Sequence, residues 1–258
     1  MAKWTAFPYA DEAYAYTAAT LKKNWERLHR GDREPFPKEA KVQDAWLAYH
    51  AGEFETAAEL GLKAGTPGYN AADKAICIYA NYLEKSEARK LKLYEEVAAR
   101  CEALQKKEPG NINAYYLHAY ALGRYSQGIS IVKALSQGLG GKVKASLEQA
   151  LKLEPGHADA HIALGAYHAE IIDKIGALVG GMTYGAKKET GMAHFAKALK
   201  LNPDSAIARI EYANGMIMLH GKAKMNDAEK LYQEAAKCKP ADAMERLDVE
   251  LAKSELED

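Results

Sequence analysis

The feature that most constrains this chain is a repeated stop, in which an amphipathic run rich in Ala, Lys and Glu ends at a proline. The four stops read KKEPGN, KLEPGH, KLNPDS and KCKPAD, around Pro109, Pro155, Pro203 and Pro240. Proline cannot continue a helix and moves the preceding residue away from helical angles, while the Gly, Asn, Asp or Ser beside it supplies a turn and the next N-cap. The pattern predicts helices that end at each proline and restart just beyond it.

The restarting helices align with one another at small residues. They begin three residues after a proline, and their third and eighth places hold Ala114 and Ala119, Ala160 and Gly165, and Ala208 and Ala213. The second helix of each unit has a small residue five places before its proline and a large one three places earlier: Ala150 with Leu147, Ala198 with Phe195, and Ala235 with Tyr232. Small residues in register allow two helix backbones to approach closely, and the large ones are expected to pack as knobs of a paired hairpin.

In combination, these places resemble the tetratricopeptide repeat (TPR), a helix-turn-helix unit of 34 residues with a proline near its end. The proline spacings here are 46, 48 and 37 residues, so two units are longer than the standard one. The resemblance implies an all-α fold, an α-α superhelix (TPR-like solenoid) of about five helical hairpins with N- and C-terminal capping helices.

We expect a single domain over residues 1–258. Its N-terminal helix and loop occupy 1–37, where Tyr14, Ala18, Leu21, Trp25 and Leu28 follow one helix face. The repeats occupy 38–240 and the C-terminal capping helix 241–258. Gly-rich insertions at about 126–142 and 175–187 lengthen the two long units.

The insertions have three interpretations. A phosphate-binding loop at GLGGK (138–142) is disfavoured because Ser136 and Val143 occupy places where a P-loop needs Gly and Ser or Thr. The favoured interpretation is structural, with glycines that let a long helix bend back over a neighbouring repeat. The third is an exposed apolar patch for a partner or a second copy of the chain, formed by Ile175, Leu178, Val179, Met182 and Tyr184.

Residues 110–205 also resemble, more narrowly, the repeat domain of the regulator of microtubule dynamics family and its bacterial relatives. The matching segments are KVKASLEQALKLEP (142–155), GALVGGMTYGAKKE (176–189) and HFAKALKLNP (194–203). The resemblance implies a non-catalytic, protein-binding repeat domain. A microtubule role does not transfer, because we expect no membrane anchor of the kind that some family members have.

Composition narrows the function further. The 35 basic side chains balance the 35 acidic ones, which removes a global field for nucleic acid or anionic lipid. The uncharged runs are too short and polar to span a bilayer, and Cys77, Cys101 and Cys238 form no CxxC pair, as is typical of reduced thiols in the cytoplasm. We therefore expect a cytoplasmic protein that has no membrane span and binds no nucleic acid.

We expect no enzymatic activity, no cofactor and no metal. The motifs G-x-S-x-G, HExxH and a strand-borne G-x-G-x-x-G are missing from the sequence. His157, His161 and His168 have a spacing that can bind a metal on one helix side. The repeat register puts His161 and His168 at places of large packing residues, which favours core histidines.

A partner is expected in the concave groove, which the first helix of each hairpin lines. The resemblance places Lys74, Asn81, Tyr116, Tyr120, Arg124, Ile162, Ile210, Asn214 and Met218 there. Such a groove suits a peptide or protein with apolar anchors, so the leading hypothesis is a non-catalytic scaffold or adaptor. A terminal helix or an insertion that fills the groove would make the same residues ordinary core. The alternative function is a transport-associated carrier of a small or lipid-like ligand, with an apolar cavity near the Gly-rich insertions.

Overall fold

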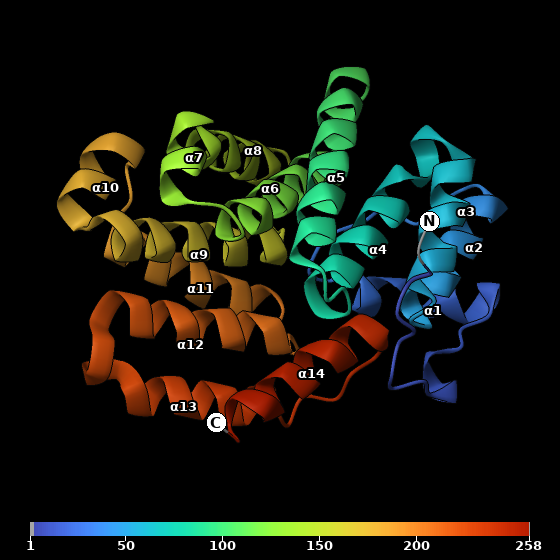
Figure 1. Cartoon of the computed structure of the whole chain (residues 1–258). Coiled ribbons are helices and arrows are strands. Elements are labelled where there is room, and N and C mark those ends of the chain that lie inside the picture. Colours follow the sequence, from blue (N-terminus) through green and yellow to red (C-terminus); the bar gives the residue numbers. More distant parts are fainter. Residues whose placement is uncertain (1–2, 258) are drawn as a thin grey trace. The chain divides into compact units, whose positions relative to one another are not determined.

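The computed structural model describes residues 3–257, and this part of the chain is helical, without a β-strand (Figure 1). Its internal contacts divide the chain into two compact units. Unit 1 contains the residues up to His29, Arg33–Gln149 and Ala241–Met244, and unit 2 contains Arg30–Asp32, Ala150–Pro240 and the residues from Glu245 onward. The single domain and its internal boundaries remain predictions. Residues 1, 2 and 258, which the predicted terminal segments include, lie outside the described residues.

Unit 1 is built from consecutive helices that pack on their neighbours in the chain. Helices α2 and α3 form one hairpin and α4 and α5 the next, and α6 packs on both α4 and α5. The bounds are η1 Glu12–Tyr14, α1 Ala18–Leu28, α2 Ala40–His50, α3 Phe54–Ala64, η2 Thr66–Gly68, α4 Tyr69–Tyr82, α5 Glu87–Lys107, α6 Ile112–Gln127, α7 Ile131–Ser136 and α8 Leu139–Leu153, which unit 1 holds as far as Gln149.

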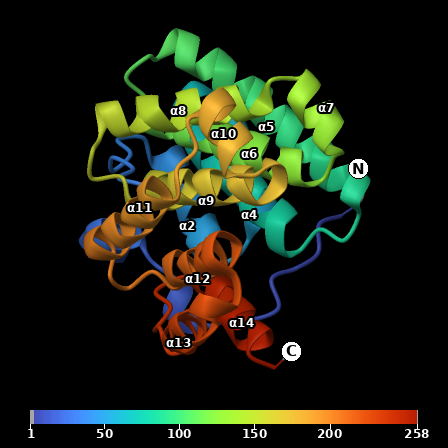
Figure 2. The same ribbon diagram turned by 90° about the vertical axis from the view of Figure 1, so that its left-hand side faces the viewer.

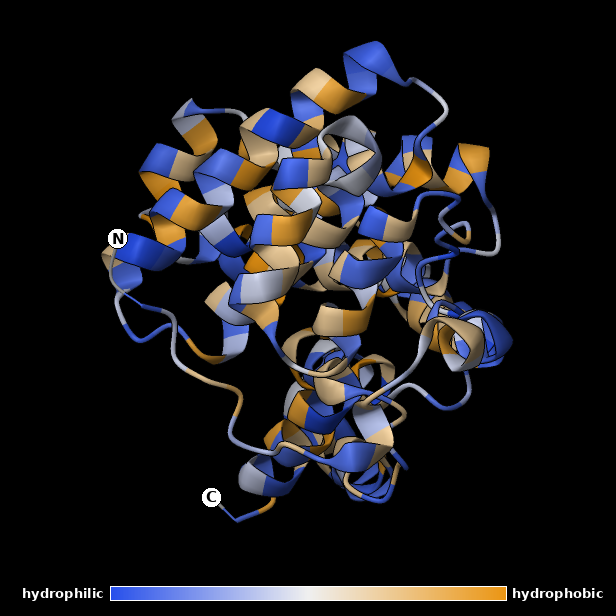
Figure 3. Cartoon of the chain, turned by 90° about the vertical axis from the view of Figure 1, so that its right-hand side faces the viewer, coloured by the Kyte–Doolittle hydropathy of each residue, from blue (hydrophilic) through white to orange (hydrophobic). Residues whose placement is uncertain are grey.

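Unit 2 repeats this arrangement. Helix α9 packs on α11 and α12, α12 packs on α13, and the short α10 packs on α9. The bounds are α9 Ala158–Ile175, α10 Ala177–Tyr184, α11 Lys188–Leu201, α12 Ala206–His220, η3 Gly221–Lys224, α13 Met225–Ala235 and α14 Ala243–Glu255, which unit 2 holds from Glu245. In Figure 3, orange apolar residues alternate with blue polar ones around the helices, as amphipathic helices require.

The predicted restarts after the prolines are confirmed at α6, α9 and α12. Each helix begins at a side-chain cap: Asn111 Oδ1, His157 Nδ1 and Ser205 Oγ accept hydrogen bonds from the backbone N–H three residues on, at 3.1, 3.0 and 3.1 Å. These N–H groups belong to Ala114, Ala160 and Ala208, the small residues of the third place. A cap of this kind satisfies one of the unpaired donors of a helix start.

The predicted close approach of helices at small residues is confirmed around Phe195. This α11 residue is fully buried, and its ring lies between Gly165 of α9 and Gly215 of α12. A Cβ built on Gly165 would lie 2.8 Å from ring atoms Cδ1 and Cε1, and one on Gly215 would also collide with the ring. The two glycines therefore set how closely α9 and α12 approach α11.

The N-terminal helix begins later than one continuous helix face predicts. Thr17 and Thr20 form a capping box, so α1 begins at Ala18. Tyr14 is buried, but it lies in the separate turn η1. Leu21, Trp25 and Leu28 form the buried face of α1, as predicted.

The C-terminal segment of unit 1 is held by residues far away in the sequence. The Tyr16 hydroxyl donates to the Ala241 carbonyl at 2.7 Å. His50 Nδ1 lies 2.7 Å from Asp242 Oδ2, and both side chains are almost fully buried. The His50 ring also contacts Trp25 and Trp46.

Both Gly-rich insertions contain a short helix, α7 in unit 1 and α10 in unit 2. Helix α10 folds back on α9, where Gly180 meets Ile171, and both ends of α10 turn at glycines with positive φ, Gly176 and Gly185 (Figure 2). The sequence analysis predicted that the insertion bends back over a neighbouring repeat. Helix α10 instead covers α9, which belongs to its own hairpin.

Candidate partner-binding surface

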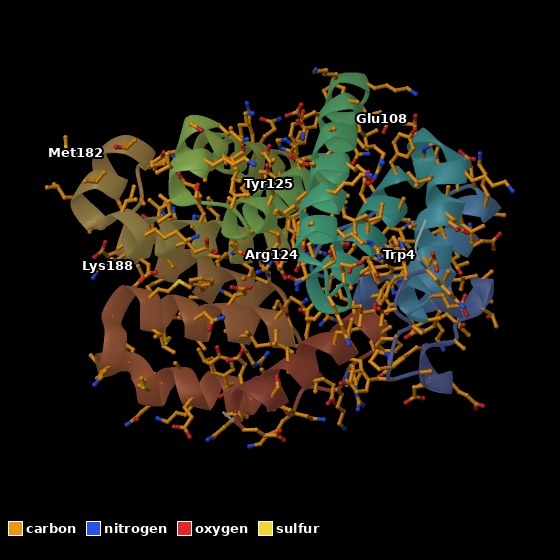
Figure 4. All side chains as sticks on the ribbon, viewed as in Figure 1. Trp4, Glu108, Arg124, Tyr125, Met182 and Lys188 are labelled. Atoms are coloured by element: carbon orange, nitrogen blue, oxygen red, sulfur yellow. The ribbon has the colours of Figure 1, made fainter. Side chains whose placement is uncertain are left out.

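Three of the predicted groove residues form a ladder on α6. Tyr116, Tyr120 and Arg124 are spaced four residues apart, so they share one helix face, and all three are half-buried. The rings of Tyr116 and Tyr120 meet edge to face with centroids 6.3 Å apart. The Arg124 guanidinium lies 5.5 Å from the Tyr120 ring centre, within cation–π range. Figure 4 labels Arg124 beside the buried Tyr125.

Helix α4 contributes two predicted residues that differ in burial. Asn81 is half-buried. Lys74 is only 6% exposed, and its Nζ lies 5.6 Å from the centre of the Tyr49 ring on α2. Lys74 therefore lies in the interior of unit 1, where its charge is partly compensated by an aromatic face.

A buried polar cluster links α4 and α5. Asp73 is fully buried, and Arg100 Nε donates to its Oδ1 at 2.7 Å. Burial raises the pKa of Asp73 to about 6, because the loss of hydration outweighs the attraction of Arg100. The same burial, with Asp73 nearby, raises the pKa of the Cys77 and Cys101 thiols well above the ordinary value. Both thiols are neutral at physiological pH and lack the thiolate character of a nucleophile.

The predicted residues of unit 2 lie mostly in its core. Ile162 packs with Ala198 and Ala208, and Ile210 packs in a cluster that includes Val249 and Ala252 of α14. The C-terminal helix therefore covers Ile210.

Asn214 and Met218 lie further along α12. Asn214 Oδ1 accepts a hydrogen bond from the Tyr232 hydroxyl of α13. Burial raises the pKa of Tyr232 to about 12. Met218 is 39% exposed. Of the four residues predicted in unit 2, Met218 is thus the most accessible.

A shallow pocket in unit 1 contains none of the nine predicted groove residues. It has a volume of about 480 Å³ and is lined by Lys22, Trp25, Glu26, His29, Arg33, Glu34, Pro35 and Phe36. Trp25 Nε1 donates to the Glu34 carbonyl at 2.7 Å, and the Glu34 carboxylate accepts hydrogen bonds from Asn70 and Asn113. From the sequence, Trp25 was expected only as a packing residue of α1. No motif predicts the contacts of Glu34 with Asn70 and Asn113, because these residues lie 36 and 79 positions further along the chain.

The three histidines tested for metal binding lie on α9 or at its N-cap. His157 and His168 are buried, whereas His161 is half-buried and meets a fourth histidine, His194 of α11. Within residues 3–257, no group of three or more His, Cys, Asp or Glu side chains has a metal-binding arrangement.

The fold defines the class of this protein as a TPR-like helical repeat, and the predicted all-α class is confirmed. A solved structure with this fold is the thermophilic TPR protein TTC0263 of Thermus thermophilus, with a TM-score of 0.58 and 17% sequence identity. The match covers 83% of this chain and 98% of that one. No family model matches the sequence, and no curated protein matches it. The narrower resemblance to the regulator of microtubule dynamics family stays a prediction.

Among the described helices, none combines the length and the apolar character that a bilayer crossing needs.

Proposed function

We propose that this protein is a non-catalytic scaffold that binds a peptide or protein partner through the first helices of its hairpins. The ladder of Tyr116, Tyr120 and Arg124 on α6 is the observation that carries the proposal. Tyrosine and arginine are enriched among the residues that dominate binding energy at protein interfaces, since each combines a large contact area with a polar end. The free thiols Cys77 and Cys101 are compatible with the reducing cytoplasm in which we place this function.

The nine predicted residues have different roles in this proposal. In unit 1, Asn81, Tyr116, Tyr120 and Arg124 are accessible enough to touch a partner, and in unit 2 the accessible residues are Asn214 and Met218. Lys74, Ile162 and Ile210 are buried and support the helices from beneath. A partner with an apolar or aromatic anchor and a carboxylate would match the tyrosine rings and the guanidinium of Arg124.

The test is a peptide-display selection on the full chain, followed by affinity measurement of the selected peptides. We expect Tyr120→Ala and Arg124→Ala each to weaken binding by at least about tenfold, as for an interface hot spot. The matched control is Tyr115→Ala, a neighbouring tyrosine on α6 whose hydroxyl donates to the Pro109 carbonyl. Equal affinities for all three variants would disprove the proposed surface.

A second candidate function is self-association through the Gly-rich insertions. Val132 of α7 is 77% exposed, and Leu178 and Met182 of α10 are 77% and 82% exposed. Figure 4 shows Met182 pointing away from the ribbon. Exposed apolar groups of this size favour a contact that removes them from water. Light scattering should show a smaller mass for Leu178→Ser/Met182→Ser but not for Leu62→Ser, an exposed leucine on α3. A monomeric wild-type chain would exclude this function.

The small-ligand carrier is the alternative proposal, and the pocket of unit 1 differs from the predicted apolar cavity both in its place and in its lining, half of which is charged. The pocket beside Trp25 and Phe36 lies between α1 and the segment that follows it, and no insertion residue lines it. Native mass spectrometry of the purified chain would show a bound small molecule, and Trp25→Ala would lose it.

A further inference from the structure

Four of the eight histidines lie in one hairpin of unit 2, formed by α9 and α11. His157 is the N-cap of α9, His161 and His168 lie on α9, and His194 lies on α11. His157 is fully buried and His168 is 3% exposed, while His161 and His194 are half-buried. One hairpin therefore holds half of the histidines of the chain, and their protonation can affect how its two helices pack.

The hydrogen bonds fix the proton positions on these rings. His157 Nδ1 accepts the Ala160 N–H at 3.0 Å, and His168 Nδ1 accepts the Lys187 N–H at 3.2 Å. His161 Nε2 lies 3.2 Å from the Pro155 carbonyl, which can only accept, so this nitrogen carries the hydrogen. The neutral His161 ring is then an acceptor at Nδ1.

The partner of that Nδ1 is His194. The two Nδ1 atoms are 2.8 Å apart, so His194 donates its hydrogen to His161. All three histidines of α9 and its cap thus use Nδ1 as an acceptor. A protonated imidazole has two donors and no acceptor, so a charged ring can no longer accept a hydrogen bond at Nδ1.

These bonds hold different parts of the hairpin. The His157 bond starts α9, and the His161–His194 bond joins α9 to α11. The His168 bond holds Lys187, the residue just before α11. The pair can keep one added proton, because His194 can move its hydrogen to Nε2 and accept from a charged His161. A second proton on the pair, or one on His157 or His168, breaks a bond.

The surroundings of the pair oppose added protons. Burial lowers the pKa of His194 to about 4, with His161 and His168 adding to the effect, and it lowers the pKa of His161 with help from Lys197. The other charged groups on the packed helices are Asp159, Glu170, Asp173 and Lys174 of α9, Lys188, Glu189 and Lys200 of α11, and Arg209 and Glu211 of α12. Helix α10 has no charged residue. Glu170 is paired with Lys174 and Arg209 with Glu234.

We infer that the α9–α11 hairpin is an acid-operated switch, which stays closed at neutral pH and opens when its histidines are protonated. The sign follows from linkage: a histidine whose folded pKa lies below the ordinary 6.5 adds no penalty above that pH. It costs the fold stability as the pH falls from about 6.5 toward 4. Opening would expose the surface around Phe195, which the closed hairpin buries completely.

Hydrogen exchange of the full chain, corrected for the intrinsic pH dependence of exchange, tests this inference. Between pH 6.5 and 4.5, amides of α9 and α11 should lose at least about tenfold protection, while those of α5 keep theirs. In His161→Gln/His194→Gln, whose amides bond without titrating, the acid loss of protection should be smaller than in wild type, because only His157 and His168 remain to be protonated. The matched control His220→Gln, at the exposed end of α12, should behave as wild type.

Two exchange results would overturn the inference: unchanged protection of wild-type α9 and α11 down to pH 4.5, or equal acid sensitivity in the double variant. If the double variant does not fold, ¹⁵N NMR of the wild-type histidine rings decides. Ring protonation must then accompany the loss of protection, and opening while the rings of the hairpin stay neutral would refute the switch.

Discussion

Replacing Gly165 by alanine separates two opposing effects of a methyl group inside a helix. Alanine is favoured over glycine in a helix interior by about 0.8–1 kcal/mol. At Gly165, however, the new Cβ would lie 2.8–2.9 Å from three atoms of the Phe195 ring. That ring is fully buried and has Gly215 on its other side, so it has no free volume to enter. Overpacking of this kind costs about 1–3 kcal/mol.

Gly123 is the matched control, since it also lies inside a helix, α6, but a Cβ there would meet nothing within 4 Å. We expect Gly123→Ala to raise the free energy of unfolding by about 1 kcal/mol. The free energy of unfolding of Gly165→Ala should be about 1–3 kcal/mol lower than that of Gly123→Ala. Urea unfolding followed by far-UV circular dichroism measures both. Tryptophan fluorescence reports unit 1 separately, because Trp4, Trp25 and Trp46 all belong to that unit.

The cause is identified by a double-mutant cycle with Phe195→Leu, which removes the ring. Without the ring, Gly165→Ala should stabilise the protein as its helix propensity predicts. The effect of Gly165→Ala should therefore differ by at least about 1 kcal/mol between the wild-type and Phe195→Leu backgrounds. The reasoning fails if Gly165→Ala stabilises as much as Gly123→Ala, or if the cycle shows no coupling.

Three further predictions concern single polar groups. Asp242→Ala should destabilise unit 1 by about 1–3 kcal/mol, because it leaves the buried His50 Nδ1 without its partner; a change below about 0.5 kcal/mol in the fluorescence-detected urea transition would contradict this. Ser205→Ala removes the cap of α12 and should cost about 1 kcal/mol by circular dichroism, whereas Ser205→Asp should restore most of it. The folded pKa of Asp73, about 6, lies above the ordinary 3.8, so the stability that this carboxyl contributes is present below pH 4 and lost as the pH rises through 6. Between pH 4 and 7, Asp73→Asn should therefore gain about 2 kcal/mol of stability relative to wild type, and the opposite trend would mean that Arg100 dominates.

The helices and their caps could be predicted because they depend on local chemistry. A proline, a capping side chain three residues before an alanine, and small residues at fixed places act within one or two turns, as at Ser205 and Gly165. The sequence left open whether a terminal helix or an insertion buries groove residues such as Ile210. An apolar position shows that something must bury it but does not show that the element is α14. The same holds for the contact of His50 with Asp242, which are 192 residues apart and have no pattern in common.

The repeat register correctly predicted that histidines of α9 serve as packing residues, but it did not show their role as hydrogen-bond acceptors. It placed His161 and His168 where large packing residues belong, and the His168 ring does pack like one, edge to face with Tyr167 and stacked on His194. Packing alone would be served equally well by phenylalanine. What phenylalanine cannot supply is the Nδ1 acceptor that His168 offers to the start of α11 and His161 offers to His194. Because that acceptor is lost on protonation, packing and acid sensitivity reside in the same rings, and a sequence pattern that scores only size detects the first property without the second.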